Sequence, residues 1–272
     1  MGERYKVEAC LLSDVGCHRS VNEDRINYIR PSDNRLLREK GSLAIVADGM
    51  GGHQAGQVAS QLALDVISRS YYEQPRTKPI DALRQAFSTA NKVLYEKANS
   101  AASLRGMGTT CSALVLCDAE CCFAHVGDSR LYRLRENELI LLTEDHTVVM
   151  ALLKDGLLTP EEARNHPERH VITRALGTSP KVTVSSSRTP LPLCLGDYYV
   201  LCSDGLYDLV EDEEIKQAVL SASPNDACAQ LTTLAKQRGG YDNISVGILA
   251  LQPLFGPDKP VPPTLEITVP VL

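Results

Sequence analysis

Four short apolar runs in the middle of the chain are separated by turns too short for anything but antiparallel pairing. "TTCSALVLC" leads into "CCFAHVGDS" through the letters "DAE", and "RLYRLR" leads into "ELILLT" around the letters "REN". β-Type runs joined by such tight polar turns form antiparallel pairs, whereas parallel strands need a crossover of about a dozen residues or more. We therefore expect these four runs to form one antiparallel meander.

Other runs predict further strands and helices on both sides of the meander. Early strand signals are "KVEACLLSDVG", "DRINYI" and "SLAIVADG", and late ones are "DYYVLCSDG" and "NISVGILAL". Apolar residues recur every three or four positions over 58–67 and over 80–94, which predicts two helices, the first beginning near Gln57. Thr159 begins a capping box with proline at the first helical position, and Ser223 begins a helix that "GG" ends.

Antiparallel strands with helices gathered in separate stretches are typical of α+β layers rather than of a parallel sheet with alternating helices. We expect two packed antiparallel β-sheets flanked by helices, a four-layer αββα sandwich. A single domain is expected over residues 1–250. The tail, residues 251–272, contains six prolines and is expected to be an extended strap or a disordered end.

Charge and cysteine use limit the partners and the compartment. The formal net charge is -6, which argues against nucleic acid as the main partner and against a polybasic membrane anchor. No run approaches the roughly 20 apolar residues of a membrane span, and the start "MGERYKVEAC" lacks a signal-peptide core. The nine cysteines are odd in number and lie mostly in apolar runs, as buried free thiols do. A cytoplasmic monomer is expected.

Acidic residues recur at the ends of the predicted strands. These positions are Glu23 and Asp24 in "RSVNEDR", Asp48 in "LAIVADG", Asp128 in "FAHVGDSR", Asp204 in "YYVLCSDG" and Asp242 in "GGYDNISV". A carboxylate beside a buried strand is costly if it stays charged and unpaired, and only Arg19 and Arg130 are adjacent cations. Each acid alone is typical of a turn or a helix cap, but together they indicate a divalent-metal cluster.

The donor set selects the metal that such a cluster would hold. It consists of oxygen atoms alone, which favours Mg²⁺ or Mn²⁺ over Zn²⁺. Gly49 follows Asp48 directly, and a residue without a side chain lets its carbonyl oxygen approach an ion. The four glycines of "GMGGHQAG" also leave a phosphate cradle or a plain tight turn as alternatives at this point.

Several other chemistries lack their motifs in this sequence. There is no C-x5-R of thiol phosphatases, no P-loop, no H-E-x-x-H and no EF-hand loop. His166 and His170 are four residues apart, but Pro167 breaks the helix that would align them, so we interpret both as structural or surface residues. His125 lies in a predicted strand and is interpreted as a satisfied core residue.

The ordered motifs of the chain resemble those of the metal-dependent PP2C-type (PPM) protein serine/threonine phosphatases, and of their bacterial branch above all. The matching segments, over about residues 5–250, are "RSVNED", "VADGMGGHQAG", "GMGTT", "VGDSRLY", "EDHT", "HPERHVITRALG", "LCSDGL" and "YDNISV". The resemblance implies a β-sandwich of two antiparallel sheets flanked by helices, which agrees with the fold expected above from the residues themselves.

The resemblance also implies metal ligands at the matching positions. Asp48 would bridge two Mg²⁺ or Mn²⁺ ions. Asp204 and Asp242 would complete the shell of the first ion, and Glu23 with the Gly49 carbonyl would serve the second, partly through water.

Three further roles follow from the same resemblance. Asp128, with Asp204, would form the third metal site found in many bacterial members, Asp24 would orient metal-bound water, and Arg19 would hold the substrate phosphate. The implied reaction is hydrolysis of phosphoserine and phosphothreonine, in which a metal-bridging hydroxide attacks phosphorus directly and no covalent intermediate forms.

One position departs from the pattern. Animal members carry a histidine, proposed to protonate the leaving oxygen, where this chain has Met50. The nearest alternative is His53, which we interpret as shaping the glycine-rich turn. Residues 145–177 resemble the variable flap of the family and are expected to contribute to substrate selection and slow opening.

The implied partners are phosphorylated serine/threonine proteins, including a cognate serine/threonine kinase. Two alternatives stay open: a regulatory phosphatase dedicated to a single partner phosphoprotein, and a catalytically inactive pseudo-phosphatase that binds phosphoproteins. Pseudo-phosphatases usually lose metal carboxylates, whereas this chain keeps them all.

Overall fold

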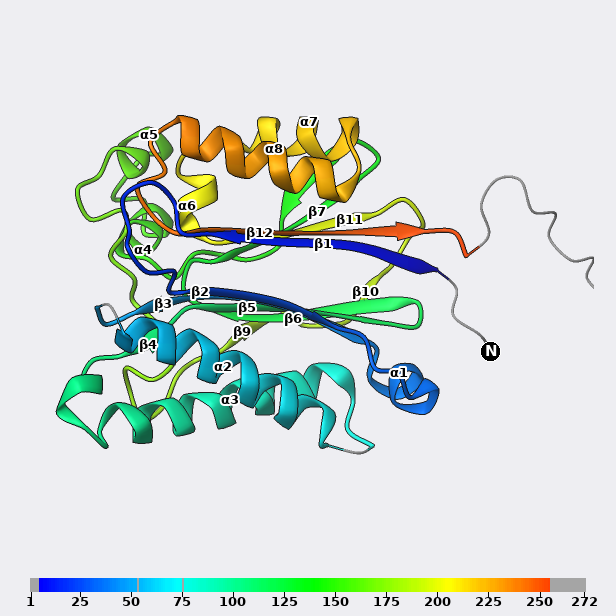
Figure 1. Cartoon of the computed structure of the whole chain (residues 1–272), viewed down its shortest axis with the longest axis horizontal. Helices are drawn as coiled ribbons and strands as arrows, with labels where there is room; N and C mark the ends of the chain where they lie inside the picture. The colour runs from blue at the N-terminus through cyan, green and yellow to red at the C-terminus, as the bar shows by residue number, and fades with distance from the viewer. Residues whose placement is uncertain (1–4, 53, 75, 255–272) are drawn as a thin grey trace, which may run out of the picture.

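The computed structural model describes residues 5–52, 54–74 and 76–254, which form two antiparallel β-sheets stacked face to face with helices on both outer sides (Figure 1). This is the four-layer α+β sandwich that the sequence predicts. The last strand ends at Gln252, two residues beyond the expected domain boundary at 250, and most of the proline-rich tail lies outside the described residues.

Each sheet combines strands from distant parts of the chain. The first sheet contains, in spatial order, β1 (Lys6–Asp14), β12 (Ile244–Gln252), β11 (Tyr198–Cys202), β7 (Arg130–Arg135) and β8 (Glu138–Leu141). The second contains β10 (Leu191–Pro192), β6 (Glu120–Val126), β5 (Cys111–Cys117), β3 (Ser42–Met50) and β2 (Asp24–Ile29), with β4 (Gly108–Thr109) paired to β3 and β9 (Ser185–Ser186) paired to β6. Every strand that the sequence predicts is present.

The predicted meander is wrong at its centre. β5 pairs with β6 and β7 pairs with β8, as expected, but β6 and β7 belong to different sheets. The chain crosses between the sheets at Gly127, whose φ is 99°. A Cβ there would lie 2.5 Å from the Cβ of Thr110, so glycine lets the crossing pass close to the start of β5. Asp128 follows directly at this crossing point.

Helices cover the outer face of each sheet (Figure 1). The helices are α1 (Asn34–Lys40), α2 (Gln54–Tyr72), α3 (Pro79–Ala98), the short 3-10 turn η1 (Ala102–Leu104), α4 (Val148–Lys154), α5 (Pro160–Arg164), α6 (Asp204–Tyr207), α7 (Asp212–Ser221) and α8 (Pro224–Gln237). α2 and α3 pack on the second sheet, α7 and α8 pack on the first, and a third apolar cluster fills the space between the sheets. Apolar burial on both faces of each sheet holds the strand ends in fixed positions.

The predicted first residues of the helices are confirmed, with one exception. Thr159 and Glu162 form the expected capping box of α5, and Ser223 accepts a hydrogen bond from Asp226 N–H at the start of α8. α2, however, begins at Gln54 rather than near Gln57. The turn into α2 is made earlier, by two glycines with positive φ directly after β3, so the helix needs no further glycine to start.

All nine cysteines are free, and five of them are buried, as the sequence predicts for cysteines in apolar strands. Among the described residues, no helix combines the length and the apolar character needed to cross a lipid bilayer.

Candidate active site

The six acidic residues predicted from the sequence gather at one end of the sandwich, where β2 begins and β3 ends (Figure 1). Asp24 and Asp48 are direct cross-strand neighbours in the β2–β3 ladder. Asp204 is the first residue of α6, directly after β11, and Asp242 lies just before β12. Burial first, and then the charges of four other aspartates, raise the pKa of Asp48 well above its ordinary value. The topology thus converts sequence-distant acids into one cluster.

Asp24 is the most deeply buried member of the cluster, at 1% exposed. Its Oδ2 accepts a 2.6 Å hydrogen bond from Ser203 Oγ, which in turn accepts the N–H of Ser245 at 3.0 Å. Its Oδ1 is buried and accepts no hydrogen bond from the described residues, and the same is true of Asp204 Oδ1. Burial raises the pKa of Asp24 to about 6 and raises that of Asp204 well above its ordinary value.

This cluster fits divalent cations better than a network of ion pairs. Within the described part of the chain, the ion pairs of the cluster involve Arg19 alone: its Nη2 lies 2.8 Å from Asp242 Oδ2, and its Nη1 lies 4.0 Å from Glu23 Oε2. Like charges directly opposite each other in a sheet are destabilising. Buried oxygen atoms that lack donors, together with an all-oxygen ligand set, are the surroundings that Mg²⁺ or Mn²⁺ would complete.

Arg130, the other cation that the sequence offers, does not serve the cluster. Its guanidinium donates three hydrogen bonds to Asp145, from Nε to Oδ1 at 3.1 Å and to Oδ2 at 3.2 Å, and from Nη2 to Oδ2 at 2.7 Å. It also lies 3.7 Å from the ring centroid of Tyr207. This arrangement fixes the start of residues 145–177 to α6, the short helix that begins with Asp204. The cation therefore anchors the flap-like segment rather than neutralising the carboxylates.

Glu23 lies against the first turn of α2, and this contact explains the last glycine of "GMGGHQAG". A Cβ at position 56 would lie 2.3 Å from Glu23 Oε1, and a Cβ at position 49 would lie 2.1 Å from the carbonyl oxygen of Gly56. Glycine at 49 and at 56 therefore lets the end of β3, the helix backbone and the Glu23 carboxylate meet. A helix N-terminus also favours a nearby negative charge.

Asn243 holds the two site loops together, and the sequence analysis did not single it out. It is 4% exposed. Its Oδ1 accepts the N–H of Glu23 at 2.7 Å, and its Nδ2 donates to the carbonyl oxygens of Val15 and Val21, each at 3.0 Å. The only signal in the sequence is its place directly after Asp242, because its partners lie more than two hundred residues away.

Asn243→Ala is expected to lower the free energy of unfolding by about 2–3 kcal/mol, because it removes the partner of one buried N–H and of two half-buried carbonyl groups. Urea denaturation of the metal-free protein measures this. The matched control is Asn34→Ala, at an exposed position on α1. A loss at Asn243 no larger than that of the control would contradict the interpretation.

Asp128 joins the cluster through the crossing between the sheets. It is 5% exposed, and burial raises its pKa to about 7. The next residue, Ser129, forms a 2.6 Å hydrogen bond between its Oγ and Thr110 Oγ1, which accepts the Asp48 N–H at 3.0 Å. After burial, the Asp128 charge is the largest contribution that raises the pKa of Asp204. The structure thus places Asp128 and Asp204 together, as the third-site hypothesis requires.

Two further residues beside Asp204 were missed by sequence reasoning. His170 Nδ1 lies 3.2 Å from Asp208 Oδ2, and the ligand atoms of these two side chains and Asp204 all lie within 4.8 Å of one another. Asp208, the C-cap residue directly after α6, is one helical turn after Asp204, a spacing that places the two side chains on the same side. His166 is half-buried, and its Nδ1 accepts the N–H of Glu168, a local bond that agrees with its interpretation as a structural or surface residue.

Two stacked histidines lie under the Asp128 turn. The rings of His125 and His146 stack with centroids 4.5 Å apart. His146 Nδ1 accepts the Gly127 N–H at 3.0 Å. Burial lowers the pKa of His125 to about 3 and that of His146 to about 4, so both are neutral near pH 7. His125 is a core residue, as expected, but its buried Nδ1 makes no hydrogen bond with the described residues, so it is not fully satisfied.

Met50 is the last residue of β3 and is half-buried. Its thioether has no proton to give, so position 50 supplies no general acid. The interpretation of His53 falls on a residue outside those that the structure describes.

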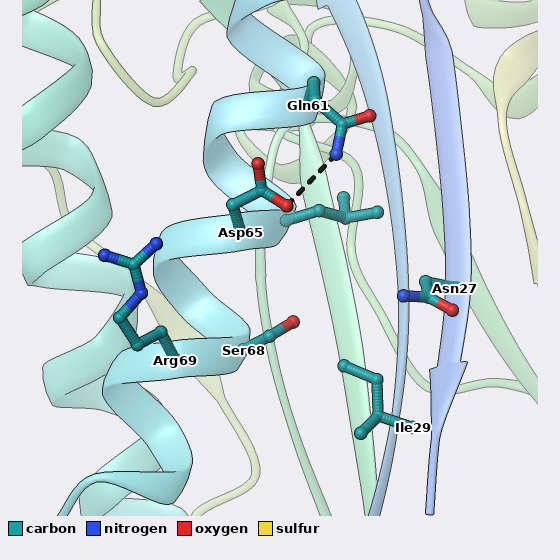
Figure 2. A pocket seen from close by; sticks show the side chains of 7 residues that line it. Asn27, Ile29, Gln61, Asp65, Ser68 and Arg69 are labelled. Carbon is teal, nitrogen blue, oxygen red and sulfur yellow. Dashed lines mark hydrogen bonds between the residues drawn. The ribbon is translucent and has the colours of Figure 1, made fainter.

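A groove of about 320 Å³ between β2 and α2 lies apart from the carboxylates (Figure 2). It is lined by Asn27, Ile29, Gln61, Leu64, Asp65, Ser68 and Arg69. Gln61 Nε2 donates to Asp65 Oδ1 at 3.1 Å, so polar groups of the groove bind each other (Figure 2). None of the predicted site residues lines it. The candidate active site is therefore the carboxylate cluster at the end of the sandwich.

Known proteins resemble this chain in both sequence and structure. A family model described as protein phosphatase 2C matches residues 19–237. The chain is 34% identical over 249 residues to protein phosphatase PhpP of Streptococcus pneumoniae, which covers 90% of this chain and 98% of PhpP. The crystal structure of serine/threonine phosphatase Stp1 from Staphylococcus aureus matches with a TM-score of 0.83 and 33% identity, over 93% of this chain and 98% of Stp1. The catalytic domain of serine/threonine protein phosphatase PstP, solved in complex with 2 manganese ions, matches with a TM-score of 0.76 and 33% identity, over 90% and 98% of the two chains.

Proposed function

We propose that this chain, which belongs to the protein phosphatase 2C family and is a serine/threonine protein phosphatase of the bacterial type, cleaves phosphate esters with Mg²⁺ or Mn²⁺. The proposed reaction forms no covalent intermediate. The observation that carries this proposal is the cluster of buried and half-buried carboxylates, two of which keep a buried oxygen atom that accepts no hydrogen bond from the described residues. A structural role alone gives no reason to gather so many acids of raised pKa in one place.

The metal ligands in this proposal are residues that the fold already brings together. Asp48 would bridge two ions, Asp204 and Asp242 would bind the first, and Glu23 with the Gly49 carbonyl would serve the second. When bound, such a pair of ions supplies an activated water for attack on phosphorus and neutralises charge on the phosphoryl oxygens. Asp128 and Asp204 would hold a third ion.

Arg19 would bind the phosphate of the substrate. In the structure its guanidinium is paired with Asp242 at 2.8 Å, and its side chain is 49% exposed. With a cation held by Asp242, the guanidinium would be free to donate to a phosphate dianion, which planar bidentate donors suit well. Asp24, held by Ser203, would orient the attacking water by accepting its proton in a hydrogen bond.

The substrates in this proposal are proteins phosphorylated on serine or threonine, including the serine/threonine kinase that acts with this phosphatase. Direct attack needs no nucleophilic side chain, which agrees with the absence of C-x5-R from the sequence. Residues 145–177 lie beside the site through the contacts of Asp145 and His170. This segment is the proposed element of substrate selection.

The test is hydrolysis of a phosphothreonine peptide with added Mn²⁺. The protein is expected to release phosphate with Mn²⁺ and to lose at least about 99% of that rate in excess EDTA, because the carboxylates alone cannot activate water. Adding Mn²⁺ beyond the chelator should restore the rate, which controls for unfolding. Phosphate release that persists in EDTA, or a phosphotyrosine peptide hydrolysed equally well, would contradict the proposal.

A further inference from the structure

We propose that His18 and Tyr241 form an aromatic ledge that contacts an apolar side chain next to the phosphorylated residue of the substrate. This inference rests on the proposed function and adds the surface of the enzyme that contacts the substrate residues next to the phosphorylated one. The ledge is defined by these two side chains alone. Neither has a role in the metal cluster.

The ledge lies directly beside the group that would bind the phosphate. His18 directly precedes Arg19 in the chain, and Tyr241 directly precedes Asp242. Arg19 and Asp242 form an ion pair, with Nη2 and Oδ2 2.8 Å apart. The rings of His18 and Tyr241 are 5.2 Å apart between centroids and tilted by 36°. Two residues that are 223 positions apart in the sequence therefore form one surface at the rim of the site.

Hydrogen bonds and close backbone contacts fix the two loops of the ledge to each other. The Cys17 N–H donates to the Gly240 carbonyl oxygen at 2.8 Å. A Cβ at Gly16 would lie 2.1 Å from the carbonyl oxygen of Asp242, so the backbones touch there. Asn243 adds the bonds to Val15 and Val21 described above. The ledge therefore keeps its position relative to Arg19, as a specificity surface must.

Tyr241 rests on bare backbone and turns its ring to solvent. It is 63% exposed. Gly239 has a φ of 124°, and a Cβ there would lie 2.4 Å from Cζ of the Tyr241 ring. The ring is thus supported from below while much of it stays open. So exposed an aromatic ring contributes little to folding, whereas aromatic rings are well suited to contact a partner with few torsions to freeze.

The charges around the ledge favour an apolar neighbour in the substrate. Lys236 is paired with Asp14 at 2.9 Å, and Arg19, which pairs with Asp242 in the structure, would be engaged by the substrate phosphate. Neither of these two cations therefore leaves a free charge that would select a charged side chain beside the ledge. An extended peptide advances about 3.3 Å per residue. A residue next to the phosphorylated one can therefore reach a ring that adjoins the phosphate-binding arginine.

The experiment compares two phosphothreonine peptides, one with leucine and one with glycine at the two positions on each side of the phosphothreonine. The wild-type protein with Mn²⁺ is expected to prefer the leucine peptide about tenfold in kcat/KM, mainly through KM. Tyr241→Ala is expected to abolish this preference, giving a ratio of about one between the two peptides. Tyr241→Phe is expected to keep it, because the ring rather than the hydroxyl makes the contact. Leu220→Ala, at an exposed leucine on α7, is the matched control that should keep the preference.

The two-peptide design separates the ledge from the metal site. If Tyr241→Ala lowers kcat/KM equally for both peptides, the ring supports the catalytic site and the ledge proposal is wrong. If the preference for leucine survives in Tyr241→Ala, or is absent in the wild type, the proposal is also overturned. Failure of the wild type to hydrolyse either peptide would instead contradict the proposed function itself.

Discussion

Asp204→Asn is expected to lower the Mn²⁺-dependent kcat on a phosphothreonine peptide by at least about a thousandfold. Asp204 would bind both the proposed first ion and the proposed third ion, so its substitution would weaken the binding of both. An asparagine keeps the shape but lacks the negative charge that compensates a divalent cation. Losing several kcal/mol of stabilisation of the transition state corresponds to such a factor, since about 1.4 kcal/mol is tenfold in rate.

The measurement is the initial rate of phosphate release at saturating Mn²⁺, together with calorimetry of Mn²⁺ binding. Asp65→Asn is the matched control, because Asp65 is an exposed carboxylate on α2, away from the cluster. The metal-free Asp204→Asn protein should also be more resistant to urea than the metal-free wild type, because burial and neighbouring aspartates disfavour the charge at position 204. A kcat within tenfold of the wild-type value would refute the assigned role.

The metal-free protein is expected to lose about 1–3 kcal/mol of stability between pH 6.5 and pH 8, whereas most proteins are little affected in this range. Burial raises the pKa of Asp128 to about 7 and raises those of Asp48 and Asp204 well above the ordinary value. These groups bind protons in the folded state that the unfolded chain has already released. Stability therefore falls as pH rises through the folded-state pKa values, at about 1.4 kcal/mol per proton and pH unit.

The two stacked histidines act in the opposite direction at lower pH. Burial lowers the pKa of His125 to about 3 and that of His146 to about 4, so the unfolded chain binds more protons at these positions once the pH falls below about 6.5. Their contribution is lost as pH falls and offsets part of the gain from the carboxylates. Because the carboxylates of raised pKa outnumber the two histidines, the metal-free protein should still be at least as stable at pH 6 as at pH 6.5.

Urea denaturation in EDTA at pH 6, 6.5 and 8 tests this prediction, and the same series in saturating Mn²⁺ is its control. Metal ions bind deprotonated carboxylates, so the metal-loaded protein should gain stability from pH 6.5 to pH 8. Metal-free Asp204→Asn, which lacks one of the groups that titrate, should show a smaller loss than the wild type. A metal-free wild type that is as stable at pH 8 as at pH 6.5 would show that the cluster is not strained without metal.

The local rules of the sequence account for the secondary structure and for the types of residue in the site. Hairpin turns, helix caps and apolar periods predict the longer strands and the three longest helices of the described residues, because each depends on neighbours within a few residues. The acids at strand ends are visible for the same reason, as is the demand for hard oxygen-binding cations. The motifs that resemble the protein phosphatase 2C family added a predicted role for each acid.

Long-range placement is different. The turn "VGDSR" looks like any tight connection, yet at Asp128 the chain changes sheets, because the apolar faces of β6 and β7 are buried in different layers. Gly56 looks like part of a helix-starting turn, yet its missing side chain admits the carboxylate of Glu23. Both depend on contacts between segments that the sequence keeps apart.

The sequence by itself thus determined the layers of this protein and its family, and it predicted the acidic residues of the candidate site, because those follow from local pattern and from which residues are present. The tertiary structure decided which groups share a neighbourhood: the bonds of Asn243 across the two loops, the pairing of His170 with Asp208, and the contact of His18 with Tyr241. These contacts arise only when the two sheets stack, since stacking brings strand ends from opposite parts of the chain to one rim. Burial at that rim is also what raises the pKa values of the carboxylates.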